Sequence, residues 1–247
     1  MNKDNFYYKK YGNSEKVLII LPGWGETRKT FDFYINNLKD RFTIYIFDYP
    51  GFGKSKKLKK SYTIYDYAKY IKEFLNNKNI INPYIMCHSF GCRISILLIS
   101  KYRVIVNRLI IISGAGIKDK SIKRKLKIFR YKILKKLSLF LPNNKKRKYL
   151  NNLVMKYGSN DYKELTNIER ITFSNIVNED LRKYIKYIYC PTLLIWGAKD
   201  NSTLLKDAKY MNKRIKDSAL IILKKGTHFV YLEYPLYILK IINNFFI

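Results

Sequence analysis

Long apolar runs and cysteines are both scarce in this sequence, and their scarcity excludes several classes of protein. No uninterrupted apolar run approaches the roughly 18 residues of a membrane-spanning helix, so we predict no such span. The first residues, Met1–Asn5, lack the apolar stretch of a secretory signal. The cysteines Cys87, Cys92 and Cys190 are odd in number and lack CxxC spacing. This argues against a disulfide framework or a cysteine metal site and predicts a cytoplasmic protein.

Acidic residues are also few. The chain has 18 Asp and Glu against 49 Lys and Arg, which leaves a formal net charge of +31. Such a charge indicates a polyanionic partner: nucleic acid, an anionic membrane face or an acidic carrier protein. The alternative, which we favour, is coding bias in an A/T-rich genome, because much Ile, Asn and Tyr accompanies the Lys. Lysines are scattered, with clusters only at Lys54–Lys60, Lys118–Lys136 and Lys145–Lys148.

No helix-turn-helix, zinc-finger or RNA-recognition pattern accompanies this charge. The sequence therefore predicts no specific nucleic-acid partner, only a non-specific contact that would weaken steeply with salt. Peripheral contact with a membrane stays open.

Short apolar runs alternate with amphipathic segments along most of the chain, and hydrophobic residues make up 47% of it. Buried parallel strands have this character, and strands that alternate with helices predict an α/β fold: a mostly parallel sheet with helices on both faces. The predicted strands are Val17–Leu21, Thr43–Phe47, Tyr84–Cys87, Arg108–Ile112, Thr192–Trp196 and Ala219–Leu223. Helices are expected from Thr63 as N-cap, directly after Ser89, and from Pro235 onwards.

The alternation stops between residues 117 and 187, where the sequence is basic and helical in period. Apolar residues form a stripe at Leu126, Phe129, Ile133, Leu137 and Phe140. We predict that residues 1–116 and 188–247 form the core and that 117–187 form a helical cap inserted in it. An enlarged crossover and a membrane-surface helix are the alternatives.

The strongest chemical signal is Ser89. The apolar strand Tyr84–Cys87 runs almost directly into this serine, and a helix begins at once. A turn this tight needs small residues two positions on either side, here Cys87 and Gly91, and it lifts the hydroxyl clear of the sheet. A helix-capping serine is the simpler interpretation of the same window.

His228 and Asp200 are the candidate partners of Ser89. The chain has only two histidines, and His88 adjoins Ser89 on a turn that should point its side chain away from the hydroxyl. His228 and Asp200 each follow a predicted strand by a short loop, and such loops converge at one sheet edge. The order Ser, Asp, His predicts a nucleophile, an orienting acid and a general base.

The run Leu21–Gly25 ends the first apolar strand with Pro-Gly-Trp-Gly. Glycines there allow backbone N–H groups to face a cavity. We predict that the N–H groups of Trp24 and Phe90 form an oxyanion hole.

Together these segments resemble the α/β-hydrolase superfamily over nearly the whole chain. The resemblance rests on Leu21–Gly25, Asp48–Ser55, the turn around Ser89, Trp196–Asp200 and Gly226–Phe229, in family order. The chain is similar to the small capped carboxylesterases, a group that includes esterases of biotin synthesis that release pimeloyl groups. It departs from the family at Pro22, where His is common, and at Cys87, where Gly is usual.

The resemblance implies a serine hydrolase that cleaves a carboxylic ester through an acyl-enzyme, without cofactor or metal. Serine at the nucleophile position disfavours the haloalkane and epoxide hydrolases, which use Asp there. The expected substrate is a small acyl ester, with an acidic carrier protein as a candidate partner. The alternatives are an amidase or iminopeptidase with the same triad, and a non-catalytic anion- or nucleic-acid-binding protein on this fold.

Overall fold

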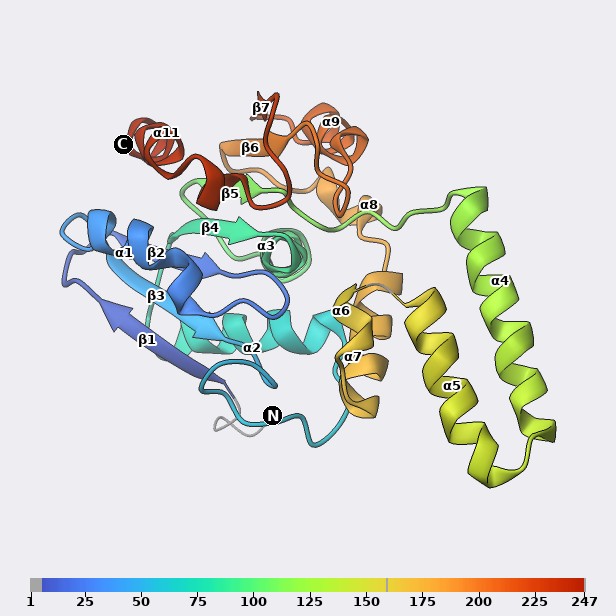
Figure 1. The fold of residues 1–247 in the computed structure, drawn as a ribbon. Helices are drawn as coiled ribbons and strands as arrows, with labels where there is room; N and C mark the ends of the chain where they lie inside the picture. Colours follow the sequence, from blue (N-terminus) through green and yellow to red (C-terminus); the bar gives the residue numbers. More distant parts are fainter. Residues whose placement is uncertain (1–5, 159, 247) are drawn as a thin grey trace.

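A computed structural model describes residues 6–158 and 160–246 and shows one seven-stranded sheet with helices on both faces (Figure 1). The strand order is β1-β3-β2-β4-β5-β6-β7. The strands are β1 Tyr7–Tyr11, β2 Val17–Leu21, β3 Thr43–Asp48, β4 Tyr84–His88, β5 Leu109–Ile112, β6 Thr192–Gly197 and β7 Ser218–Leu223. The six predicted strands are confirmed within one or two residues at each end. The prediction about Met1–Asn5 lies outside the described residues.

Strand β1 was not predicted from the sequence. It pairs antiparallel with β3 at the sheet edge, while all other neighbouring strands pair parallel. Its sequence carries Lys9 and Lys10, both exposed, so it lacks the continuous apolar run of a buried strand. Charged side chains on an edge strand oppose pairing with another chain.

Two apolar layers cover the sheet, and alternate residues of each strand enter opposite layers. On β3, Ile44 and Ile46 join the layer formed by α1 Asp32–Leu38 and α11 Pro235–Phe245. Tyr45 and Phe47 join the other layer, with α2 Ile64–Asn77, α3 Phe90–Ser100 and α9 Leu205–Arg214. The α/β prediction, a mostly parallel sheet with helices on both faces, is therefore confirmed.

Local signals account for where helices begin. Thr63 and Asp66 form a reciprocal capping box at the start of α2, since each side chain accepts a hydrogen bond from the other residue's backbone N–H. Pro235 occupies the first turn of α11, where its missing N–H costs nothing. The 3₁₀ helix η2 Arg28–Phe31 precedes α1, and the short helix α10 Val230–Glu233 precedes α11.

The described residues between β5 and β6 form helices and connecting loops, without a strand. The helices are α4 Ile122–Leu137, the 3₁₀ helix η3 Ser138–Phe140, α5 Asn143–Tyr157, α6 Asn160–Lys163, α7 Asn167–Asn178 and α8 Arg182–Ile185. The pair α4 and α5 extends away from the sheet, whereas α7 lies against the core (Figure 1). The Tyr65 hydroxyl of α2 donates to Glu179 Oε1 just beyond α7, and Arg93 of α3 donates to the Glu179 carbonyl. This arrangement fixes the end of α7 to the core.

No helix in the described part of the chain is both long and apolar enough to cross a membrane.

Candidate active site

Ser89 lies on a sharp turn between β4 and α3. Its φ of 46° is in the left-handed region, which a serine rarely adopts. The Ser89 N–H donates to the Ile112 carbonyl, and the Ser89 carbonyl accepts from the N–H groups of Cys92 and Ala115. These contacts with two neighbouring segments hold the strained backbone in place.

Gly91 allows this turn to sit against the sheet. A Cβ at Gly91 would lie 2.0 Å from the carbonyl oxygen of Leu21, the last residue of β2. The start of α3 therefore packs against the backbone that leads into Trp24. This contact requires glycine at a position where the sequence pattern indicated a small residue.

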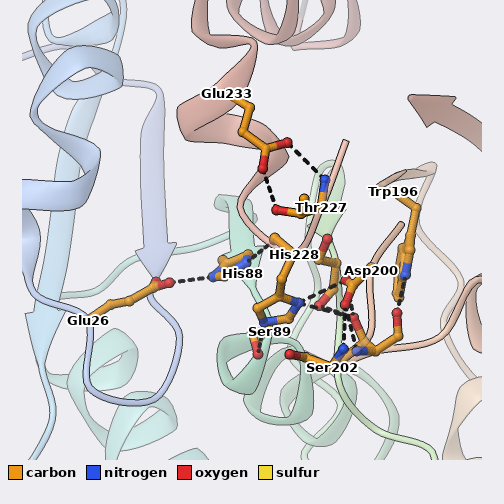
Figure 2. A network of polar contacts seen from close by, with 11 residues as sticks. Glu26, His88, Ser89, Trp196, Asp200, Ser202, Thr227, His228 and Glu233 are labelled. Carbon is orange, nitrogen blue, oxygen red and sulfur yellow. Dashed lines mark hydrogen bonds and ion pairs between the residues drawn. The ribbon is translucent and has the colours of Figure 1, made fainter. Parts of the chain in front are cut away.

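The structure brings His228 and Asp200 to Ser89 (Figure 2). Nε2 of His228 is 3.0 Å from Oγ of Ser89, and Nδ1 of His228 is 2.8 Å from Oδ2 of Asp200. Ser89 follows β4, Asp200 follows β6, and His228 follows β7. The three side chains meet because carboxyl ends of parallel strands share one edge of the sheet.

Asp200 is held by four hydrogen-bond donors. Oδ1 accepts from the N–H groups of Ser202 and Thr203, while Oδ2 accepts from the Thr203 hydroxyl and from His228. Burial alone would raise the pKa of Asp200, but the bond and charge of His228 and the Thr203 bonds outweigh it. The pKa of Asp200 is therefore lowered. A carboxylate against Nδ1 places the imidazole proton there and leaves Nε2 free to accept from Ser89.

The loops that carry Asp200 and His228 are bound to each other. The N–H of Lys199 donates to the Gly226 carbonyl, and a Cβ at Gly197 would lie 2.3 Å from the Thr227 carbonyl oxygen. Glu233 of α10 accepts from both the N–H and the hydroxyl of Thr227 (Figure 2). The acid and the base are thus positioned as one unit.

Glu26 and His88 form a buried pair beside His228 that sequence reasoning missed. Nδ1 of His88 lies 2.7 Å from Oε1 of Glu26. Nε2 of His88 is 3.0 Å from the backbone oxygen of His228, so the ring points away from the Ser89 hydroxyl, as expected. The available sequence signal for this pair was Glu26 itself, because acidic residues are rare in this chain. It lies three residues after Gly23, whose N–H donates to it.

Glu26 carries its charge in the interior of the protein. Burial opposes ionisation of Glu26, but the charge and hydrogen bond of His88, the Gly23 N–H and the Tyr231 side chain outweigh it. The pKa of Glu26 is therefore lowered from its ordinary value.

The predicted oxyanion residues lie next to each other. Phe90 is the first residue of α3, so its N–H is among those that a helix cannot satisfy internally. The rings of Trp24 and Phe90 are 5.5 Å apart, and Trp24 also contacts Phe52 and Phe173 of α7. Aromatic side chains from the core and from α7 thus enclose this side of the turn.

The loop Asp48–Ser55 has a structural role beside the site. Asp48 Oδ2 accepts from the Lys54 N–H, and the Ser55 hydroxyl both donates to the Asp48 carbonyl and accepts from the Tyr7 N–H. Gly53 has φ 55° and lies against the Asp48 carboxylate, where a Cβ would clash. The loop joins β1 to β3 and supports Phe52 near Trp24.

Among the described residues no group of three or more His, Cys, Asp and Glu side chains is placed to hold a metal ion.

Comparison with known proteins shows the family of the chain. Residues 16–235 match the family model described as alpha/beta hydrolase fold. A pimeloyl-(acyl-carrier protein) methyl ester esterase of Wigglesworthia glossinidia brevipalpis is 27% identical over 260 aligned positions, which cover 97% of each chain. An esterase of Exiguobacterium antarcticum superposes with a TM-score of 0.73 at 20% identity, over 97% of this chain and 94% of that one. A Pseudomonas aeruginosa hydrolase gives 0.74 at 18% identity, over 98% and 94%.

Proposed function

The chain belongs to the alpha/beta hydrolase fold family, and we propose that it is a serine hydrolase that cleaves carboxylic esters. Ser89 is the nucleophile, His228 the general base, and Asp200 the acid that orients it. The observation that carries the proposal is the continuous contact from Asp200 Oδ2 through the imidazole to Ser89 Oγ, at 2.8 and 3.0 Å.

Acylation begins when His228 Nε2 takes the proton from the Ser89 hydroxyl as Oγ attacks the ester carbonyl carbon. The carbonyl π electrons move to oxygen, and the resulting oxyanion accepts hydrogen bonds from the N–H groups of Trp24 and Phe90. One such donor typically lowers the barrier by about 2.7–4 kcal/mol. Collapse of this intermediate breaks the bond to the alcohol oxygen, which leaves with the proton from Nε2.

Deacylation repeats these steps with water. His228 Nε2 accepts a proton from water as its oxygen attacks the acyl carbon, and the proton then passes to Ser89 Oγ as the acid is released. Asp200 stays ionised throughout and stabilises the imidazolium. Neither step needs an oxidant, a reductant or a cofactor.

We assign residues 117–187 to a cap that bounds the acyl site. The contact of Phe173 with Trp24 supports this assignment, because it brings α7 against the oxyanion segment. A surface cavity of about 380 Å³ between α2 and α7 is lined by residues such as Thr63, Tyr65 and Glu179, and it contains none of the triad. It has no part in the proposed chemistry.

The substrate class we favour is a neutral or anionic acyl ester, including one linked to an acidic carrier protein. The name of the Wigglesworthia relative and the net charge of +31 support this choice. A carrier-linked methyl ester should be turned over with a higher kcat/KM than the free methyl ester, and salt should reduce the difference. Equal values for both would remove the carrier from the proposal.

A fluorophosphonate probe tests the nucleophile. Labelling should occur on the peptide that contains Ser89 and should disappear in Ser89→Ala, together with turnover of p-nitrophenyl esters. Ser100→Ala is the matched control, because Ser100 is a buried serine on the adjoining helix α3. Persistent turnover in folded Ser89→Ala would defeat the proposal. A series of esters of increasing acyl length, with the matching anilides, measures the acyl preference and the ester-to-amide ratio.

A further inference from the structure

Helix α4 and the adjoining η3 expose an apolar face to solvent. Ile122, Phe129 and Phe140 are 75%, 61% and 87% exposed. They share one side of the helix axis with three further exposed residues, Leu126, Ile133 and Leu137. Monomeric surfaces rarely gather apolar side chains in this way, which marks the face as an interaction site.

This face is not the one that holds α4 to its neighbour. Tyr131 lies on the opposite side of α4, and its ring centroid is 6.1 Å from that of Tyr157 on α5. Leu153 and Val154 of α5 are buried. The exposed stripe therefore remains uncovered after the α4–α5 hairpin has packed, and α4 is the outermost element on this side (Figure 1).

Basic residues accompany the stripe. Helix α4 contains eight Lys and Arg and no acidic residue, and Lys118–Lys148 contains fourteen basic residues and one acid. Arg130, Lys132 and Lys136 border the apolar positions. Coding bias raises the number of lysines, but it does not place lysines and apolar residues on different sides of a helix.

We propose that this face, defined by the six apolar residues of α4 and η3 and their basic neighbours, docks on anionic lipid bilayers. An exposed apolar stripe with a basic border is the arrangement of interfacial helices, whose apolar side chains enter the acyl boundary while lysines meet anionic headgroups. A second copy of the chain is a poor occupant, because docking would bring the same positive charges together.

Vesicle co-sedimentation tests the docking. The full chain should bind vesicles that contain phosphatidylglycerol and should bind pure phosphatidylcholine far less, with affinity falling as salt rises. The double variant Phe129→Ser, Ile133→Ser should bind about tenfold more weakly or worse, because two apolar anchors are lost. Leu236→Ser with Ile105→Ser is the matched control, since both residues are 74% exposed and lie outside α4. The melting temperature should be unchanged in both variants.

Four results would overturn this proposal. The first is failure of the full chain to bind anionic vesicles, and the second is equal binding by the α4 double variant. The third is a dimer, seen by analytical ultracentrifugation, that the α4 variant dissociates. The fourth is an acidic carrier protein that the intact chain binds in preference to vesicles and that the variant does not bind.

A second inference rests on the buried contact between Glu26, His88 and the His228 backbone, and it builds on the proposed function. The carboxylate of Glu26 and the backbone carbonyl of His228 each face one ring nitrogen of His88, Nδ1 at 2.7 Å and Nε2 at 3.0 Å. The His88 ring is also packed between His228 and Tyr231, with centroids 4.8 Å from each. Glu26 and His88 thus connect the main chain of residue 228 to the segment after β2.

We infer that Glu26 and His88 are positioning residues for His228. Neither side chain has a contact with Ser89 Oγ among the described residues, so their effect passes through the carbonyl of residue 228. A displacement of the imidazole by 1 Å would lower the rate of proton transfer by about a hundredfold.

Substitution of Glu26 by Leu or Gln separates positioning from a general structural role. In Glu26→Gln the amide oxygen can accept from the Gly23 N–H and the amide N–H can donate to His88, which then donates to residue 228 as a neutral ring. Glu26→Leu removes these contacts. We expect kcat to fall tenfold or more in Glu26→Leu with KM unchanged, and we expect Glu26→Gln to have a kcat near that of the unmodified chain. If Glu26→Leu does not fold, His88→Phe replaces it as the variant that lacks these contacts.

Fluorophosphonate labelling distinguishes failure of the positioning role from failure of the proposed hydrolase function. Lack of fluorophosphonate labelling in the unmodified chain refutes the hydrolase itself. Labelling of the unmodified chain with an equal rate in folded Glu26→Leu, or a Gln variant as impaired as Leu, refutes the positioning role alone.

Discussion

Substitution of Asp200 by Asn should reverse the direction of the hydrogen bond between His228 and Ser89. The Asn oxygen will occupy the Oδ1 position, because two backbone N–H donors, those of Ser202 and Thr203, point at it. The amide nitrogen then replaces Oδ2 and faces His228 Nδ1 at about the native 2.8 Å. An amide N–H donates, so the imidazole must accept at Nδ1 and carry its proton on Nε2. That proton points at Ser89, and the base can no longer accept from the hydroxyl.

The expected loss of kcat is about ten-thousandfold, the size seen when a triad acid is replaced in this way in serine proteases, and it corresponds to about 5 kcal/mol of barrier. Stability should change much less. The two backbone bonds are retained and the Thr203 hydroxyl can direct its single proton to the Ser113 carbonyl, so we expect a loss of about 1–2 kcal/mol in unfolding free energy.

The assay compares Asp200→Asn with Thr203→Val, which removes one hydroxyl donor from Oδ2 and leaves the carboxylate in place. The Val variant should lose no more than about tenfold in kcat. Turnover of p-nitrophenyl esters and the rate of fluorophosphonate labelling measure the reactivity of Ser89. Urea denaturation measures the unfolding free energy. A folded Asn variant that keeps a tenth of the activity would refute the assignment of Asp200.

Packing and burial set three more expectations. Gly91→Ala should lower the unfolding free energy by about 3 kcal/mol, because its Cβ would lie 2.0 Å from the Leu21 backbone oxygen; a urea midpoint near that of the unmodified chain would contradict this. Burial raises the pKa of Cys190 to about 11, so iodoacetamide should spare the native thiol at about pH 8 and modify the urea-unfolded chain; rapid native labelling would be inconsistent. The lowered pKa values of Glu26 and Asp200 mean that both stabilise the fold above their ordinary values of 4.5 and 3.8, and that this stabilisation is lost progressively as pH falls from those values towards the lower pKa of the folded state. Glu26→Gln should therefore flatten the fall in unfolding free energy below about pH 5, and an unchanged slope would count against it.

The central strands could be predicted because a strand buried on both faces leaves an uninterrupted apolar run. β2, for example, reads Val-Leu-Ile-Ile-Leu and is buried over its last four residues. β1 could not be predicted in this way, since its Tyr-Tyr-Lys-Lys-Tyr sequence is half exposed and gains its partner only when β3 is in place. The segment after β5 is helical as expected, while its cap boundaries at 117 and 187 stay a prediction.

The candidate triad could be predicted because few residues competed for each role. His228 was the single eligible imidazole, and Ser89 and Asp200 each follow an apolar run that ends at the same sheet edge. The contact between Glu26 and His88 had no such pattern. It joins the loop after β2 to the end of β4, and only the parallel pairing of these strands shows that the two side chains meet.

The amino-acid composition alone does not decide whether the excess of positive charge has a function, but the arrangement of the charged residues does. A count of 49 basic residues fits both coding bias and a polyanionic partner, because neither interpretation predicts a different total. The two differ in arrangement: bias distributes lysines without regard to neighbours, whereas a docking surface needs apolar side chains that stay exposed beside them. Phe129 and Ile133 on α4 and Phe140 on η3 meet that condition, while Lys9 and Lys10 on β1 lie on an edge strand without such an apolar group. Charge on α4 is therefore the part of the excess for which function is the better explanation.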